Sequence, residues 1–202
     1  TINRVAATET DVALRMNGHA EFWRISSMSL QTALFIVLAR ILDSNDNVHS
    51  IHQVLNATMA HPEFFQGAAI RARKLALPGL PWAPGLLDEC IQRAWEPTAQ
   101  DLRLLKKLLA PHTAKFDAIY RPIRNQIAHI ILKDESLILG LYNRTQKDDI
   151  DELLCCLHTL VHAIREMWIN GRHPELSGDN YGYARRVAEI DHATERLLRE
   201  IP

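Results

Sequence analysis

The sequence contains few cysteines and no excess of either charge. Its three cysteines are an odd number, and Cys155 and Cys156 are adjacent, which argues against a disulfide framework and favours free thiols in a reducing compartment. The 23 Lys and Arg residues balance 24 Asp and Glu residues, for a formal net charge of −1. The molecule as a whole therefore has no electrostatic preference for nucleic acid or an acidic membrane, and any such preference has to come from a local patch.

Long apolar runs and targeting signals are also missing. The longest apolar run near the amino terminus, residues 33–39, is about a third of a membrane span, and no signal-peptide pattern appears. Aromatic residues make up 6% of the chain and glycine and proline are not enriched, which argues against a β-rich sandwich and against disorder. The 202 residues, 47% of them hydrophobic, suffice for one good core. We expect a soluble, cytoplasmic protein with no membrane partner.

Apolar residues recur at spacings of three and four along most of the chain, a pattern typical of amphipathic helices. We therefore expect a single-domain, all-α bundle of about six or seven helices. Its core covers about residues 20–175, and a helix at residues 183–201 is an appended element. The other expected helices cover residues 2–42 with a break at 17–18, 50–59, 62–75, 86–95, 97–130 and 147–170.

Three stretches raise particular expectations. Pro111 and Pro122 remove amide donors and should kink the long helix or make it restart. Residues 28–42 are apolar on most faces, as in a helix buried at the centre of a bundle or in a dimer interface. Residues 133–146 are less regular, and their alternating pattern allows a short extended piece.

A group of polar side chains interrupts the apolar pattern of the long helix, in the sequence Tyr-Arg-Pro-Ile-Arg-Asn-Gln-Ile-Ala-His at residues 120–129. Arg121, Asn125 and His129 are spaced by four residues, so that they form one polar stripe on a helix, and Arg124 lies one position away from it.

Basic residues surround this group. Residues 97–133 contain seven cations and two anions, a local charge of +5, whereas residues 147–170 carry a charge of −3. Because the charge is segregated in this way, we expect the basic part to bind an anionic ligand. The predicted substrate-binding residues are Arg121, Lys115 and Lys133.

A histidine beside two arginines and an amide suits phosphate chemistry. The imidazole can act as a general base or acid near neutral pH, and arginine can stabilise a pentacoordinate phosphate. In RNA the 2′-hydroxyl is a built-in nucleophile, so this set of groups could cleave the backbone without a metal. On an ideal helix, however, Arg124 and His129 lie about 140° apart around the axis. A kink at Pro122 or a second copy of the chain would bring them together.

The motif also resembles a known family. Residues 124–129, Arg-Asn-Gln-Ile-Ala-His, fit the R-x4-H signature of the HEPN superfamily, in which a polar residue follows the arginine. The flanks, Ala-Arg-Ile-Leu-Asp at 39–43 and Trp-Ile-Asn-Gly at 168–171, are similar to the U-type abortive-infection (AbiU-like) branch. The resemblance spans roughly residues 20–175.

The resemblance implies a specific function. HEPN domains are all-helical and mostly dimeric, and many are metal-independent endoribonucleases of toxin–antitoxin and phage-defence systems. Arg124 and His129 would be the catalytic pair, Asn125 would support them, and two copies would form a composite site for RNA without a cofactor. An antitoxin protein is a further implied partner. Some HEPN toxins carry a modified tyrosine two residues after the histidine, a position occupied here by Ile131.

Other interpretations remain open at this point. The same basic patch could belong to a non-catalytic helical module that binds RNA, a nucleotide or a partner protein. Arg121 and Arg124 could also serve only to pair with the acidic residues of the 147–170 helix. Lastly, His158, His162 and Glu166 have the i, i+4, i+8 spacing of a metal site, but a solvated polar edge explains them better.

Overall fold

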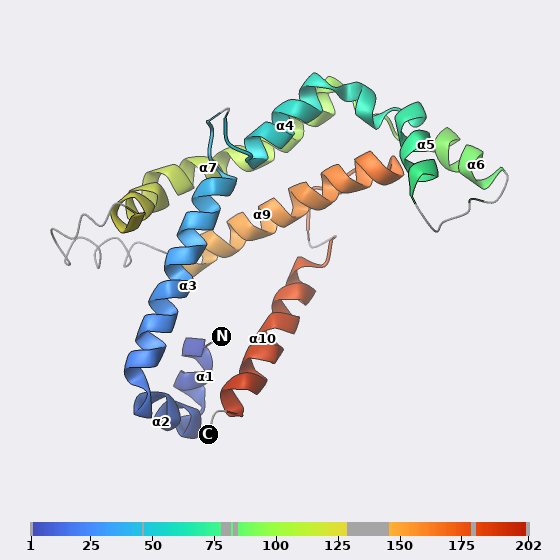
Figure 1. The fold of residues 1–202 in the computed structure, drawn as a ribbon. Coiled ribbons are helices and arrows are strands. Elements are labelled where there is room, and N and C mark those ends of the chain that lie inside the picture. The colour runs from blue at the N-terminus through green and yellow to red at the C-terminus, as the bar shows by residue number, and fades with distance from the viewer. Residues whose placement is uncertain are drawn as a thin grey trace.

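The computed structural model describes residues 2–45, 47–77, 82, 85–128, 146–178 and 181–200, and every regular element in these ranges is helical (Figure 1). The all-α expectation is therefore confirmed. The α-helices are α1 (Ile2–Thr8), α2 (Thr10–Gly18), α3 (Ala20–Ile41), α4 (Ile51–Ala60), α5 (Gly67–Ala76), α6 (Leu86–Gln92), α7 (Ala99–Ala128), α9 (Lys147–Arg165) and α10 (Tyr183–Arg199). A 3-10 turn, η1 (Pro62–Phe65), precedes α5, and a π-helical turn, η2 (Glu166–Asn170), extends α9.

The helices outnumber the six or seven expected because two expected helices are divided. The expected break at residues 17–18 is present, since α2 ends at Gly18, and a further break at Glu9 separates α1 from α2. Pro62 opens η1 rather than a long helix, and α5 begins only after Gln66, whose backbone is extended.

Local sequence signals account for several helix ends. The Gln53 amide donates a hydrogen bond to Ser50 Oγ at 3.4 Å, so that Ser50 caps the start of α4. Before α7, the amide of Asp101 donates to Thr98 Oγ1 while the amide of Thr98 donates to an Asp101 carboxylate oxygen, a reciprocal capping box. Gly171 ends η2 in a left-handed conformation, as the Asn-Gly pair predicts.

The long helix α7 does not restart at either proline. Pro111 and Pro122 both lie on its exposed side, where water can satisfy the carbonyls that lose their amide donors. The opposite side is anchored by side chains that are almost fully buried, namely Leu102, Leu105, Leu109, Phe116 and Tyr120. This continuous apolar face holds the helix together across the prolines, which the local signal alone could not reveal.

The main core lies between α7, α9, α4 and the carboxyl-terminal third of α3. Within it, the Tyr120 ring stacks between Phe35 of α3 and Phe116 of α7, at centroid distances of 5.7 and 5.8 Å. The core therefore fixes the position of Tyr120, the first residue of the polar motif, against α3.

A second, smaller core joins the two ends of the chain. Val5, Val12 and Leu198 are buried together there, where α1 and α2 meet the last turns of α10 (Figure 1). Ion pairs between Arg4 and Glu195 and between Arg199 and Glu9 surround it. The two helices α3 and α10 connect this small core to the main one.

The expectation for residues 28–42 holds only in part. Phe35, Leu38 and Leu42 are buried in the main core, but most apolar side chains of α3 before Phe35 are exposed to solvent. By length and composition, α3 is the one helix among the described residues that could cross a membrane. A single helix that passes this test on length and composition is weak evidence for a membrane span.

Candidate functional site

The predicted catalytic motif lies at the carboxyl end of α7 (Figure 1). Arg124 and Asn125 belong to the last two turns of this helix, and the Asn125 side chain is exposed. The Arg124 side chain, His129 and Lys133 lie outside the described residues, as does the expected extended piece at 133–146. The catalytic assignment therefore stays a prediction. The described residues show the contacts that hold α7 in place directly before the motif.

That support is a contact between α7 and the first turn of α9, centred on the buried carboxylate of Asp149. The Lys115 ammonium donates a hydrogen bond to Asp149 Oδ1, and the Tyr120 hydroxyl lies 3.4 Å from Oδ2 of the same carboxylate. The Tyr120 hydroxyl also lies 3.4 Å from the carbonyl oxygen of Gln146, the residue before α9. The start of α9 is thereby fixed to α7 directly before the motif.

The electrostatics of this contact follow from the hydrogen bond between Lys115 and Asp149 and from the burial of Tyr120. The hydrogen bond to Asp149 raises the pKa of Lys115, so that the ammonium form persists to higher pH. Burial raises the pKa of Tyr120, and the nearby Asp149 carboxylate raises it further, so the hydroxyl stays protonated and remains a donor. The carboxylate is thus the anionic acceptor of two donors from α7.

Two of the predicted substrate-binding residues have protein partners in the structure. Lys115 is paired with Asp149, and the Arg121 guanidinium donates through Nε to Asp117 Oδ1 at 2.9 Å, one helical turn away. Pairing with the acidic residues of α9 was one interpretation of Arg121 and Arg124. Lys115 makes such a pair and Arg121 pairs within α7, whereas the Arg124 side chain lies outside the described residues. Either cation would have to exchange its carboxylate in order to bind a phosphate.

Sequence reasoning missed the role of Tyr120 and Asp149. A signal was present, because a tyrosine opens the motif and four acidic residues crowd the start of the 147–170 helix. Which of these acids would be buried is a matter of tertiary packing, and helical spacing does not specify it.

The alternative metal site on α9 has no third ligand among the residues that the structure describes. The rings of His158 and His162 lie 4.3 Å apart, each beside a tyrosine, with Tyr183 and Tyr181 at 5.6 Å. Glu166 instead accepts a hydrogen bond from Asn170 and an ion pair from Arg172. Among the described residues no group of three or more metal-binding side chains comes together.

The cysteines agree with the expectation of free thiols, since none of the three is in a disulfide. Cys156 is buried against α7, where its thiol lies 3.8 Å from the Leu108 carbonyl oxygen. Burial raises the pKa of Cys156 to about 11, so the reactive thiolate is scarce at neutral pH. It is a packing residue of the core.

Comparison with known proteins identifies the family of this chain. The sequence model of the AbiU2 family of HEPN domains matches residues 4–187, which cover both the main core and the motif. No curated protein and no solved structure matches the chain.

Proposed function

The chain belongs to the AbiU2 family of HEPN domains, which relates it to abortive infection, and on this premise we propose that it is a metal-independent endoribonuclease. The observation that supports the proposal most is the position of the motif. Arg124-Asn-Gln-Ile-Ala-His129 follows Tyr120, which is fixed by stacking in the core and by its contact with Asp149. Catalytic groups that follow a rigid, packed helix can be held in a productive arrangement.

In the proposed reaction the 2′-hydroxyl of RNA attacks the adjacent phosphorus and the 5′-oxygen leaves. His129 accepts the proton of the 2′-hydroxyl or donates one to the leaving oxygen. Arg124 stabilises the pentacoordinate phosphate, while Asn125 and Arg121 position it. The products are a 2′,3′-cyclic phosphate and a 5′-hydroxyl, and no metal or cofactor takes part.

Two copies of the chain supply the complete site in this proposal. Within one ideal helix the two catalytic side chains point about 140° apart, whereas a two-fold axis can set the arginine of each copy near the histidine of the other. The setting we propose is phage defence in the cytoplasm, with RNA as the substrate and an antitoxin protein as a candidate regulator.

The decisive test is the variant His129→Ala. Incubation of labelled RNA with the wild-type chain in EDTA is expected to give fragments with 2′,3′-cyclic phosphate ends, and His129→Ala is expected to give none. His112→Ala serves as the matched control, because His112 also lies on α7 and is only partly buried. If the wild-type chain cleaves no RNA, or His129→Ala cleaves as fast as the control, the proposal is wrong.

The alternative function is that of a non-catalytic module that binds RNA. Lys115 and Arg121 are already paired with carboxylates, so such a module would bind the RNA mainly through other cations. A module of this kind would bind labelled RNA with an affinity that falls with salt, and it would leave the RNA intact. The same incubation in EDTA therefore distinguishes the two functions.

A further inference from the structure

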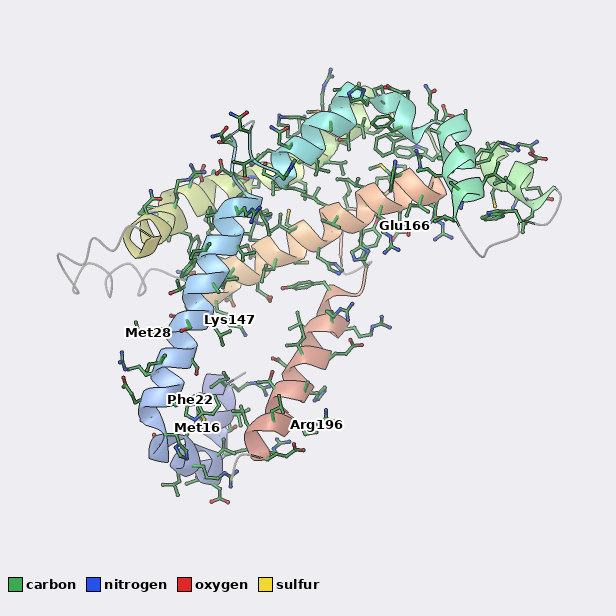
Figure 2. All side chains as sticks on the ribbon, viewed as in Figure 1. Met16, Phe22, Met28, Lys147, Glu166 and Arg196 are labelled. Atoms are coloured by element: carbon green, nitrogen blue, oxygen red, sulfur yellow. The ribbon has the colours of Figure 1, made fainter. Side chains whose placement is uncertain are left out.

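The junction of α5, η1 and η2, at the end of α9 away from the motif, carries two exposed aromatic rings. Phe64 of η1 is 46% exposed and Trp168 of η2 is 44% exposed. They are two of the three phenylalanine and tryptophan side chains that are exposed in the described part of the chain. Lys147 and Glu166 mark the two ends of α9 in Figure 2, and the junction lies at the Glu166 end.

Each of the two rings lies against a planar neighbour. The Arg73 guanidinium of α5 is over the Trp168 ring, 4.9 Å from its centroid. The His61 ring stacks on Phe64 at a centroid distance of 5.1 Å and an interplanar angle of 24°. Because one face of each ring is covered in this way, the surface that remains exposed comes from the other face and the edge.

Arg73 also holds the two rings together. Its Nε donates a hydrogen bond to the Trp168 carbonyl oxygen at 2.9 Å, and its Nη2 donates one to the Phe64 carbonyl oxygen at 2.5 Å. The backbones that carry the two rings are therefore bound to one guanidinium. A guanidinium has five N–H groups in one plane, so these two hydrogen bonds leave donors for a further acceptor.

The junction contains cations that lack a carboxylate partner. Arg73 and the buried Lys74 form no ion pair among the described residues. The Lys74 ammonium instead donates to the Asn170 amide oxygen at 3.2 Å and lies over the Trp82 ring. Partial burial lowers the pKa of Arg73, which is the direction expected for a cation without a nearby carboxylate.

The two acids of these three elements are engaged elsewhere. Glu166 pairs with Arg172, and Glu63 lies 2.9 Å from His61. Unpaired positive charge beside exposed ring faces is the combination that binds single-stranded nucleic acid, in which phosphates contact cations and unpaired bases stack on aromatic rings. A protein partner would instead select a contiguous apolar surface without such charges.

We propose that this junction is a second binding site for single-stranded RNA, in which unpaired bases stack on Trp168 and Phe64 and a phosphate binds Arg73. A duplex does not suit the site, because its bases are already stacked on one another. The choice of RNA over single-stranded DNA rests on the proposed function, since stacking accepts both.

The junction and the motif are far apart. The 19 residues of α9 span about 28 Å, and the start of this helix is fixed to Tyr120 while its end continues into η2. A stacked strand advances about 3.4 Å per nucleotide, so it needs about eight nucleotides to cover this distance. The junction therefore adds affinity for a long RNA and none for a dinucleotide that occupies the motif.

Fluorescence anisotropy with a labelled oligouridylate of about 20 nucleotides tests the site. His129→Ala in EDTA is the background for all variants, so that the RNA stays intact whether or not the wild-type chain cleaves it. Trp168→Ala is expected to weaken binding by about tenfold, and Trp168→Phe, which keeps a ring, by much less. Leu197→Ala is the matched control, because Leu197 is 64% exposed and lies on α10.

The salt dependence of binding separates the phosphate contact from stacking. Loss of one phosphate contact on a single strand reduces the slope of log K against log salt concentration by about 0.7. Arg73→Gln should show this reduction, whereas Arg73→Lys, which keeps the charge, and Trp168→Ala should keep the original slope. Circular dichroism and thermal unfolding check that each variant is folded.

Cross-linking locates the bound bases. RNA that contains iodouridine should form photo-cross-links to Trp168 or Phe64, identified by mass spectrometry. The proposal is overturned if Trp168→Ala binds as tightly as Leu197→Ala, if no cross-link forms in η1 or η2, or if the duplex or the same strand made of DNA binds more tightly than the single-stranded RNA.

Cleavage is measured separately, so that the two proposals can fail independently. If the wild-type chain cleaves RNA, Trp168→Ala should raise KM for the long RNA, leave kcat unchanged and have no effect on a dinucleotide substrate. A wild-type chain that cleaves no RNA but binds it at Trp168 would refute the proposed function and support the junction. Cleavage of the long RNA with an unchanged KM in Trp168→Ala would refute the junction and support the proposed function.

Discussion

Replacement of Gly171 by alanine should destabilise the protein by about 2–5 kcal/mol, the sum of a backbone cost and a packing cost. Gly171 has φ = +58°, a conformation that costs an L-residue about 1–2 kcal/mol. A Cβ atom there would also lie 2.7 Å from Ala94 Cβ and 2.9 Å from Ile70 Cδ1, well inside van der Waals contact. Relief of such an overlap in a packed core costs about 1–3 kcal/mol.

The position of Gly171 leaves little room for adjustment. Its amide donates to the Met167 carbonyl at 3.1 Å, and its own carbonyl accepts from the Trp95 amide at 2.7 Å. For a chain of this length the entropy of unfolding is roughly 0.4 kcal/mol per kelvin, so a loss of about 3 kcal/mol corresponds to about 7 °C in Tm.

Three other glycines separate the two costs. Gly182 also has a positive φ, +74°, but its Cβ position is open, so Gly182→Ala should show the backbone cost alone. Gly67 lies in α5, where an added Cβ would be 2.9 Å from Ile91 Cγ2, so Gly67→Ala should show the packing cost alone. Gly18 has neither problem, and Gly18→Ala should be neutral or slightly stabilising.

The measurement is thermal and urea unfolding of all four alanine variants, followed by circular dichroism. The expected order of destabilisation is Gly171→Ala first, then Gly67→Ala and Gly182→Ala, then Gly18→Ala. A Gly171→Ala variant that loses no more stability than Gly182→Ala would refute the argument, because the close contacts with Ala94 and Ile70 would then cost nothing.

Two further predictions concern the contacts of α7. In urea unfolding, Asp149→Ala should have a free energy of unfolding about 1 kcal/mol lower than that of Asp149→Asn, because the asparagine amide oxygen can still accept a hydrogen bond from Tyr120. Equal free energies of unfolding for the two variants would contradict this prediction. Removal of the carboxylate should also lower the raised pKa of Lys115, measurable by NMR. Burial raises the pKa of Cys156 to about 11 from 9.0, so its contribution to stability is complete below about pH 9 and falls as the pH rises toward 11. Mass spectrometry after alkylation at neutral pH should find Cys156 modified more slowly than Cys155, unless urea is present.

Much of the helical pattern could be predicted because its signals are local. The cap at Ser50, the acidic first turn of α9 and the stop at Gly171 each depend on residues within a few positions, and each is present in the structure. The apolar face of α9 follows from helical spacing in the same way, since Leu153, Leu157 and other residues at this spacing are buried.

What local signals could not decide depends on distant contacts. Of the two outcomes expected at Pro122, a kink or a restart, the restart does not occur, because Tyr120 stacks on Phe35 of α3 and on Phe116 and so holds α7 in the core. Similarly, the apolar run before Phe35 indicated a helix buried in a bundle or in a dimer interface, but among the described residues α3 packs mainly through its last turns and through Trp23 near its start. Periodicity shows which side of a helix is apolar, and it does not show what covers that side.

The basic stretch of residues 97–133 also differs between sequence and structure. Its net charge can be counted from the sequence, but the charge that is available to a ligand depends on which cations are paired. Lys115 and Arg121 are paired, while Arg103 and Lys107, near the start of α7, are exposed and have no ion pair in the described part of the chain. They lie about 25–30 Å along the helix from Arg124, well beyond the screening length of about 8–10 Å at physiological salt. Charges so far away can attract and hold RNA, but they cannot stabilise charge at the reacting phosphate. In the proposed enzyme that task falls to Arg124, and Lys115 contributes indirectly by anchoring α7 to Asp149.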